Sequence, residues 1–135
     1  MRNKNRHLRR ISQLILQNEK TTPDGWSRIV VMAEFGPGMS AISGYVFDQE
    51  GTATTALPRK PSPRGAIEAL RAEMTEPGKE PWVACLIQLD AKEDDVEVNA
   101  EFEYDDMNRW HITAGNREEI LAKLRPSTKK PKKKR

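Results

Sequence analysis

Cysteine and histidine, the residues that bind zinc, form disulfides or take part in nucleophilic catalysis, are scarce in this sequence. Its 135 residues include one cysteine, Cys85, and two histidines, His7 and His111, which lie far apart in the chain. A zinc site needs three or four such ligands at compatible spacing, and neither histidine has a serine or cysteine nucleophile in a suitable setting. We therefore expect no metal, no cofactor and no enzymatic activity.

Long apolar segments are also missing. No apolar segment led by lysine or arginine resembles a signal peptide or a membrane span. The lone cysteine cannot form an intramolecular disulfide. From these two observations together, the sequence predicts a cytoplasmic protein without a membrane partner. Cys85 lies in the apolar run 82–87, which predicts an inert core thiol. Gly36-Pro37-Gly38 lacks the lysine and the helix that follow a phosphate-binding loop.

The formal net charge of +3 averages over segments of opposite sign. Eleven of the 23 basic residues lie near the two ends: Arg2, Lys4, Arg6, Arg9, Arg10, Lys129, Lys130, Lys132, Lys133, Lys134 and Arg135. Without those 11, 12 basic residues remain against 20 acidic ones, so the middle of the chain carries about −8. The body is acidic and the ends are basic.

Hydrophobic periodicity and turn residues predict the order α-β-β-β-α-β-β-α. The expected elements are a helix over 6–19, strands over 26–35, 40–47 and 52–57, a helix over 62–76, strands over 82–90 and 96–104, and a last helix over 116–125. This pattern is typical of an α+β fold in which a mostly antiparallel sheet of about five strands packs with helices on one face, while the other face is partly open. We expect one domain over 1–126 and a disordered basic tail over 127–135.

Two helix starts have recognisable capping residues. Ser62 is expected to be the N-cap of the second helix, with Pro63 at its first helical position. Asn116 is expected to cap the last helix, with Glu119 as its capping-box partner.

The acidic stretch from residue 90 to 106 is the strongest chemical feature. It holds nine carboxylates against the single cation Lys92: Asp90, Glu93, Asp94, Asp95, Glu97, Glu101, Glu103, Asp105 and Asp106. Strict alternation over 96–104 predicts one solvent-exposed face, with a negative stripe roughly 25 Å long. Neither Asp94-Asp95 nor Asp105-Asp106 has the turn glycine and the ligand spacing of a calcium loop.

A solvated face that keeps the protein soluble is the simplest interpretation of this stripe. Like charges two residues apart on one strand repel, however, which is a cost that solubility does not require. Tyr104 and Trp110 flank the acidic end and would suit apolar anchors of an interface. The sequence thus predicts a surface for a basic protein partner, made of Glu97, Glu101, Glu103, Tyr104, Asp105, Asp106 and Trp110.

Several short motifs, in this order, resemble the YezG-like bacterial immunity proteins, which neutralise polymorphic toxins. The motifs are Pro23-Asp24-Gly25-Trp26 after the first helix, Ser43-Gly44-Tyr45-Val46-Phe47, Ala66-Ile67-Glu68-Ala69-Leu70-Arg71, Pro77-Gly78-Lys79-Glu80-Pro81-Trp82 and Phe102-Glu103-Tyr104-Asp105-Asp106. The resemblance covers residues 6–125. It implies a non-enzymatic antitoxin that binds its toxin in the cytosol and occludes or locks the active site, with the acidic strand and its tyrosine as the contact surface.

A toxin domain with a basic active-site cleft is therefore the expected partner, and the toxin's own activity is left open. The contact could instead use the sheet face near Tyr45 and Phe47 or the loop Lys79-Glu80-Pro81. The lysine-rich end departs from the family. It is either a solubilising end or a weak, nonspecific nucleic-acid contact, so the alternative function is a nucleic-acid-associated accessory protein. A small enzyme ranks third.

Overall fold

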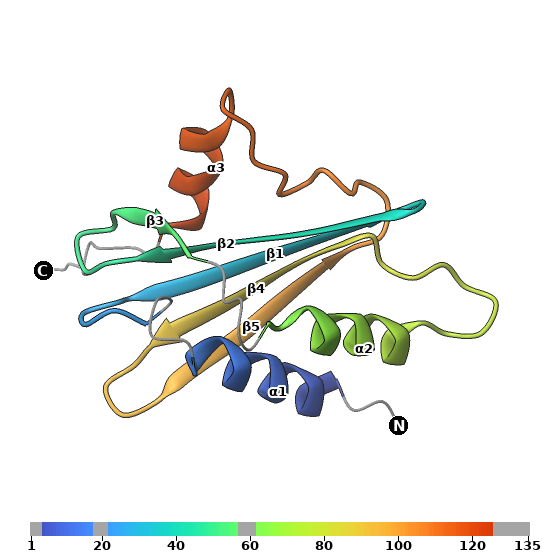
Figure 1. Cartoon of the computed structure of the whole chain (residues 1–135), viewed down its shortest axis with the longest axis horizontal. Coiled ribbons are helices and arrows are strands. Elements are labelled where there is room, and N and C mark those ends of the chain that lie inside the picture. The colour runs from blue at the N-terminus through green and yellow to red at the C-terminus, as the bar shows by residue number, and fades with distance from the viewer. Residues whose placement is uncertain (1–3, 18–21, 57–61, 126–135) are drawn as a thin grey trace, which may run out of the picture.

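The computed structural model describes residues 4–17, 22–56 and 62–125, so the basic tail falls outside the described residues. The described residues form α1 (Lys4–Leu16), β1 (Arg28–Gly36), β2 (Met39–Phe47), β3 (Ala53–Thr55), α2 (Arg64–Met74), β4 (Ala84–Ala91), β5 (Val96–Glu103) and α3 (Arg117–Leu124) (Figure 1). The α+β class and the predicted order of elements are confirmed.

The five strands form one antiparallel sheet in the order β3-β2-β1-β4-β5. β1 is central and pairs with β2 and β4 along most of its length. The two edges are unequal, because β3 has three residues and β5 has eight. Among the strands of the described residues, only β5 therefore offers a long edge.

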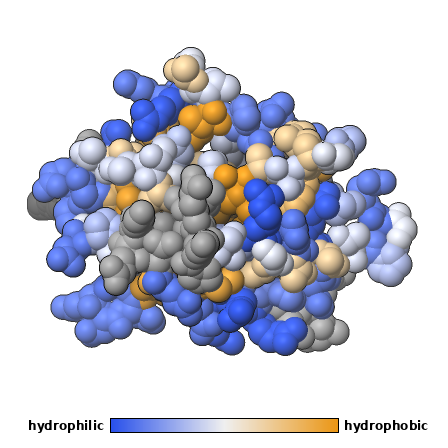
Figure 2. All heavy atoms as spheres, in the orientation of Figure 1, coloured by the Kyte–Doolittle hydropathy of each residue, from blue (hydrophilic) through white to orange (hydrophobic). Residues whose placement is uncertain are grey.

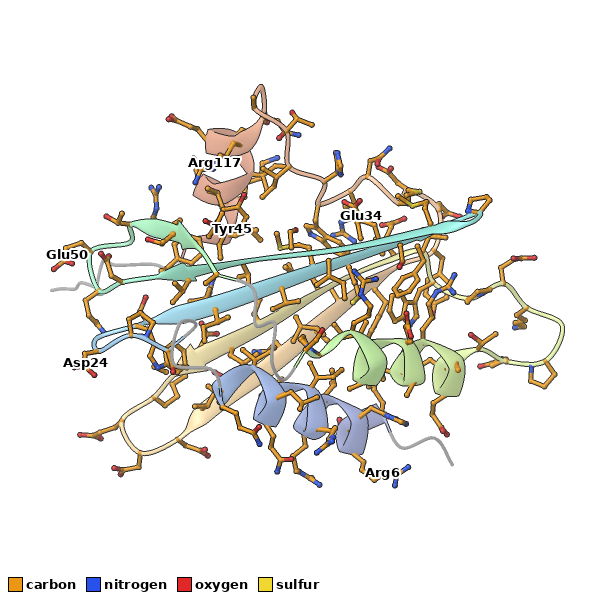
Figure 3. The ribbon with its side chains drawn as sticks, in the orientation of Figure 1. Arg6, Asp24, Glu34, Tyr45, Glu50 and Arg117 are labelled. Carbon is orange, nitrogen blue, oxygen red and sulfur yellow. The ribbon has the colours of Figure 1, made fainter. Side chains whose placement is uncertain are left out.

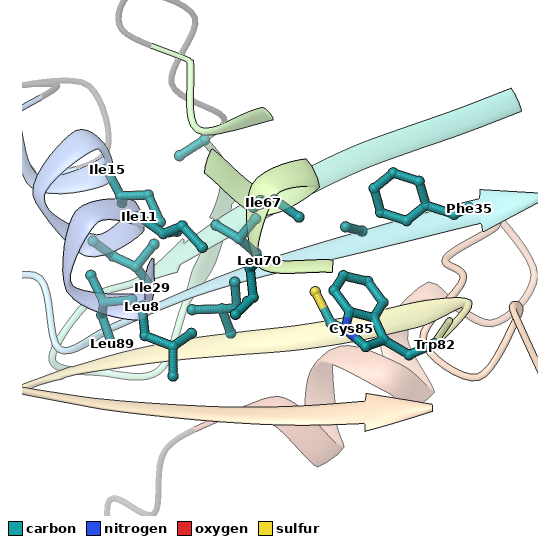
Figure 4. Close-up of a cluster of buried hydrophobic side chains, with 14 of the residues drawn as sticks. Leu8, Ile11, Ile15, Ile29, Phe35, Ile67, Leu70, Trp82, Cys85 and Leu89 are labelled. Carbon is teal, nitrogen blue, oxygen red and sulfur yellow. The ribbon is translucent and has the colours of Figure 1, made fainter. Parts of the chain in front are cut away.

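One face of the sheet packs against α1 and α2. Leu8, Ile11 and Ile15 recur at helical spacing on α1 and are buried, as are Ile67 and Leu70 on α2. They meet the alternate strand residues Ile29, Val31, Val46, Cys85, Ile87 and Leu89 (Figure 4). The predicted core position of Cys85 is confirmed, and burial raises the pKa of its thiol to about 12.

The other face is partly covered as well, which differs from the expected helices on one face only. Leu121 and Leu124 of α3 are buried with Tyr45 and Phe47 of β2, and Arg117 lies 5.6 Å from the Tyr45 ring (Figure 3). The expectation of an open sheet face near Tyr45 and Phe47 is therefore wrong. The physical reason is visible in β1, where residues 29–33 are buried on both faces and form an unbroken apolar run, as in a doubly covered strand.

The helix starts differ from the predicted capping. Pro63 is the N-cap of α2 and not its first helical residue, although Ser62 Oγ still accepts the N–H of Arg64 at 3.2 Å. At α3, Asn116 is the N-cap but makes no side-chain capping bond. Its Oδ1 accepts the N–H of Thr113 at 2.7 Å, so it stabilises the preceding turn, and the capping box with Glu119 does not form.

Hydrophilic side chains dominate the surface seen in Figure 2, with small apolar patches between them. Among the described residues, no helix has the length and apolarity needed to cross a membrane.

Candidate binding surface on the edge strand

The predicted alternation of β5 is present in the structure. Val96, Val98, Ala100 and Phe102 are half-buried and pack against the core cluster under α1 and α2. Glu97 and Glu101 are exposed on the opposite face of the sheet. The strand therefore divides an apolar side from an acidic side, as its period of two requires.

We define the acidic surface as the exposed side of β5 and the bend that follows it: Glu97, Glu101, Glu103, Tyr104, Asp105 and Asp106. The structure brings these six predicted residues together along one sheet edge. Within the described part of the chain, two cations form ion pairs with them. Lys92 Nζ is 3.3 Å from Glu97, and Arg109 contacts both Glu101 and Glu103 at 3.3 and 3.2 Å. Five carboxylates and two cations leave the surface with about −3.

Asp90 belongs to the fold and not to this surface. It forms an ion pair with Arg28 across the β1–β4 pair, and both side chains are largely buried. Arg28 also donates to the C=O of Leu124 at 2.9 Å, which ties the end of α3 to the sheet. One of the nine carboxylates in the acidic stretch is thus structural.

Glu103 shapes the bend at the end of β5. Its Oε2 accepts the backbone N–H of Asp105 at 3.0 Å and that of Asp106 at 3.1 Å. These two bonds, followed by the contact with Arg109, hold the pKa of Glu103 below its usual value. The ionised carboxylate therefore fixes the bend that presents Asp105 and Asp106.

The β5–α3 loop (residues 104–116) crosses the second face of the sheet, and three consecutive residues anchor it. Arg109 reaches β5, while the Trp110 ring is buried in the second core cluster. His111 Nδ1 lies 2.9 Å from Oε2 of Glu34, a buried carboxylate on β1 (Figure 3). Sequence reasoning missed the roles of Arg109, His111 and Glu34, because the path of this loop leaves no periodic signal.

Trp110 does not have the position expected of a surface anchor. Only 7% of its surface is exposed, and its ring lies 4.6 Å from the Arg109 guanidinium. It therefore supports the arginine that binds Glu101 and Glu103. Of the two predicted aromatic anchors, only Tyr104 has an exposed ring, with 51% of its surface accessible.

Tyr104 borders a hollow of about 410 Å³ between the acidic surface and the loop after α2. Met74 is its other apolar lining residue, and Glu76, Lys79 and Glu80 complete it. The loop at Lys79–Pro81, which the sequence suggested as an alternative contact, thus adjoins the acidic end of β5. One partner can contact both.

Within the described residues, no group of three or more His, Cys, Asp or Glu side chains is arranged to hold a metal ion. His7 lies 3.7 Å from Glu73 and His111 lies 2.9 Å from Glu34, so the two histidines have different partners. The acidic surface is consequently the feature with the clearest chemistry, and that chemistry is charge and hydrogen-bond acceptance.

Comparison with known proteins adds no assignment to this geometry. No protein-family model and no curated protein sequence matches the chain. The candidate function therefore depends on the arrangement of the edge strand, the bend after it and the hollow beside Tyr104.

Proposed function

We propose that this chain is an immunity protein that binds a cognate bacterial toxin domain and occludes its basic active-site cleft. The observation that carries the proposal is the acidic surface on β5, which continues into a fixed bend beside an exposed tyrosine. It presents carboxylates in a row, as a polyanionic substrate presents phosphates. The motif resemblance to the YezG-like proteins supports the same function.

Charge complementarity explains how such a surface would act. A preformed negative patch accelerates association with a basic cleft and orients the encounter. Asp105 and Asp106 contribute most directly, since no basic side chain in the described ranges lies within ion-pair distance of either. Tyr104, beside its hollow, supplies apolar area of the kind that anchors interfaces.

The arrangement also supports binding over a purely solubilising role. A solubilising face needs no fixed geometry, whereas Glu103 and Arg109 hold this bend through four contacts: two backbone N–H groups donate to Glu103, and Arg109 pairs with both Glu103 and Glu101. Preorganised charge costs less entropy on binding than mobile charge.

Affinity capture from the native host tests the proposal. Tagged protein is incubated with nuclease-treated lysate at moderate salt, and bound proteins are identified by mass spectrometry. We expect one stoichiometric partner that contains a toxin domain. Asp105→Lys combined with Tyr104→Ala should lose this partner, and E101K/E103K should weaken its binding without unfolding the protein.

The matched control for Asp105→Lys is Glu50→Lys. It also reverses one negative charge, in the turn at the opposite edge of the sheet (Figure 3). It should retain the partner. Equal capture by all variants at low salt would overturn the assignment of the binding surface, and absence of any toxin partner would overturn the function.

A nucleic-acid-associated accessory protein is the second candidate, and one observation favours it. Arg6, Arg9 and Arg10 are exposed on α1, and Arg6 projects away from the sheet (Figure 3). With the lysine-rich end they would form two basic segments. This candidate predicts duplex binding that weakens steeply with salt and disappears when residues 128–135 are deleted.

A further inference from the structure

The outer edge of β5 carries backbone groups that no described strand uses. The register pairs Ala84 with Glu103 at one end and Ala91 with Val96 at the other. The C=O groups of Asp95 and Glu103 both face β4, because they accept the N–H groups of Lys92 and Val83 at 2.8 Å. In an antiparallel pair, alternate residues bond to the same neighbour. Asn99 and Glu101 therefore bond to β4, whereas the N–H and C=O groups of Val98 and Ala100 point away from the sheet.

A groove runs beside this edge on the α1 side. It has a volume of about 440 Å³ and lies between α1 and the first half of β5. It is lined by the apolar residues Leu8, Leu16, Val96 and Val98 and by the polar residues Asn5, Arg9, Ser12 and Asp95. Apolar side chains of a strand placed next to β5 would enter this groove.

We propose that β5 accepts an extended segment of a basic partner protein as a sixth strand of the sheet. Main-chain hydrogen bonds to Val98 and Ala100 would supply affinity, as in other cases of strand addition. Side chains of the added strand alternate between the two faces. One set enters the groove beside α1, and the other lies next to Glu97 and Glu101.

This geometry specifies the sequence of the partner segment. Residues directed into the groove are apolar, and the residues between them are lysine or arginine, since opposite charges on neighbouring strands attract. The partner strand therefore alternates apolar and basic residues over about the eight residues that β5 spans. A segment that extends past Glu103 reaches the second hollow, beside Tyr104.

A second copy of this chain fits the edge poorly. If two β5 strands paired antiparallel, the same face would continue across both, so Glu97, Glu101 and Glu103 would face the equivalent glutamates. Like charges on adjacent strands destabilise the pair. Natural sheets use such charges to prevent edge-to-edge association, and here they favour a basic partner over self-pairing.

Amide hydrogen exchange of the full chain, followed by NMR, tests the proposal with defined probes. The first probe is a capped peptide of about eight residues in which valine and lysine alternate, and the second replaces its lysines with glutamates. We expect the lysine peptide to slow exchange at Val98 and Ala100 by about ten-fold or more. The glutamate peptide should not do so, and Asn99 and Glu101 should be protected throughout.

A third probe keeps the valine–lysine sequence but carries N-methyl groups on alternate amides. It retains the charge, but its methyl groups keep the probe backbone from coming within hydrogen-bond distance of β5, so it should bind more weakly and leave Val98 and Ala100 unprotected. Unchanged exchange at both amides under saturating lysine peptide would overturn the proposal. Protection that grows with protein concentration in the absence of peptide would also overturn it, in favour of self-pairing.

The inference names the binding mode of the proposed immunity function and rests on it for the identity of the partner. The two can fail separately. If a toxin is captured but leaves the Val98 and Ala100 amides unprotected, the strand-addition proposal is wrong and the immunity proposal stands. If the lysine peptide protects both amides but no toxin is captured, the strand-addition proposal stands and the immunity proposal is wrong.

Discussion

Arg109 Nη1 lies 3.2 Å from Oε1 of Glu103, six residues earlier in the chain. The same guanidinium reaches Glu101 through its second nitrogen and rests against the buried Trp110 ring. The loop after β5 thus returns a positive charge to the strand that it leaves. This contact both orders the acidic surface and reduces its net charge.

Replacing Arg109 with alanine should separate these two effects. The ion pairs are exposed, so we expect the free energy of unfolding in urea to fall by only about 1 kcal/mol. Association with the captured basic partner should become faster at low salt, because Glu101 and Glu103 lose their cation. Stopped-flow rates at two salt concentrations measure this, and slower association by the folded variant would show that order matters more than charge.

Acid should weaken the bend at Glu103. The pKa of Glu103 is lowered in the folded protein, so its stabilisation is complete above the ordinary glutamate value of about 4.3 and is lost as pH falls through the folded pKa. E103Q keeps the acceptor oxygen and removes the charge. We expect the difference in unfolding free energy between wild type and E103Q to shrink below about pH 4.3. A difference that stays constant from pH 7 to 3 would contradict this.

His111→Ala should destabilise the protein although nearly half of this side chain is exposed. The substitution leaves the Glu34 carboxylate buried with no partner among the described residues, at a cost of about 1–3 kcal/mol. Adding Glu34→Gln should recover part of the loss, since a neutral amide costs less to bury. Urea denaturation of the two single variants and the double variant measures the coupling, and strict additivity would argue against a direct interaction.

Cys85 should be unreactive in the folded protein. Its side chain is buried and its pKa is about 12, so almost no thiolate exists at pH 8. We expect iodoacetamide to label the native chain negligibly and to label it fully in denaturing urea, as measured by mass spectrometry. Rapid labelling without denaturant would indicate that β1 and β4 separate in the native state.

The order of elements and the alternation of β5 were predictable because both depend on local periodicity. Val96, Val98, Ala100 and Phe102 alternate with polar residues, and a half-buried edge strand is the structure that this pattern favours. Which strand lies at the edge of the sheet was not predictable in the same way, since strand order depends on pairing between distant segments.

The position of Trp110 depended on the route of the β5–α3 loop, which no periodic pattern specifies. The unbroken apolar run in β1 is typical of a sheet covered on both faces, and the prediction of helices on one face did not take it into account. Arg109 lies just after the acidic stretch at 90–106, and the turn at residues 107–110 brings its side chain back to Glu103.

The unequal edges of the sheet limit the stoichiometry of any complex formed by strand addition. β3 pairs with β2 at only three positions, so it offers an incoming chain little backbone. One molecule can consequently add a strand at the β5 edge alone. The partner strand then occupies the position at which a further copy would have to pair. Assembly then stops at one partner per chain and cannot propagate into a fibre.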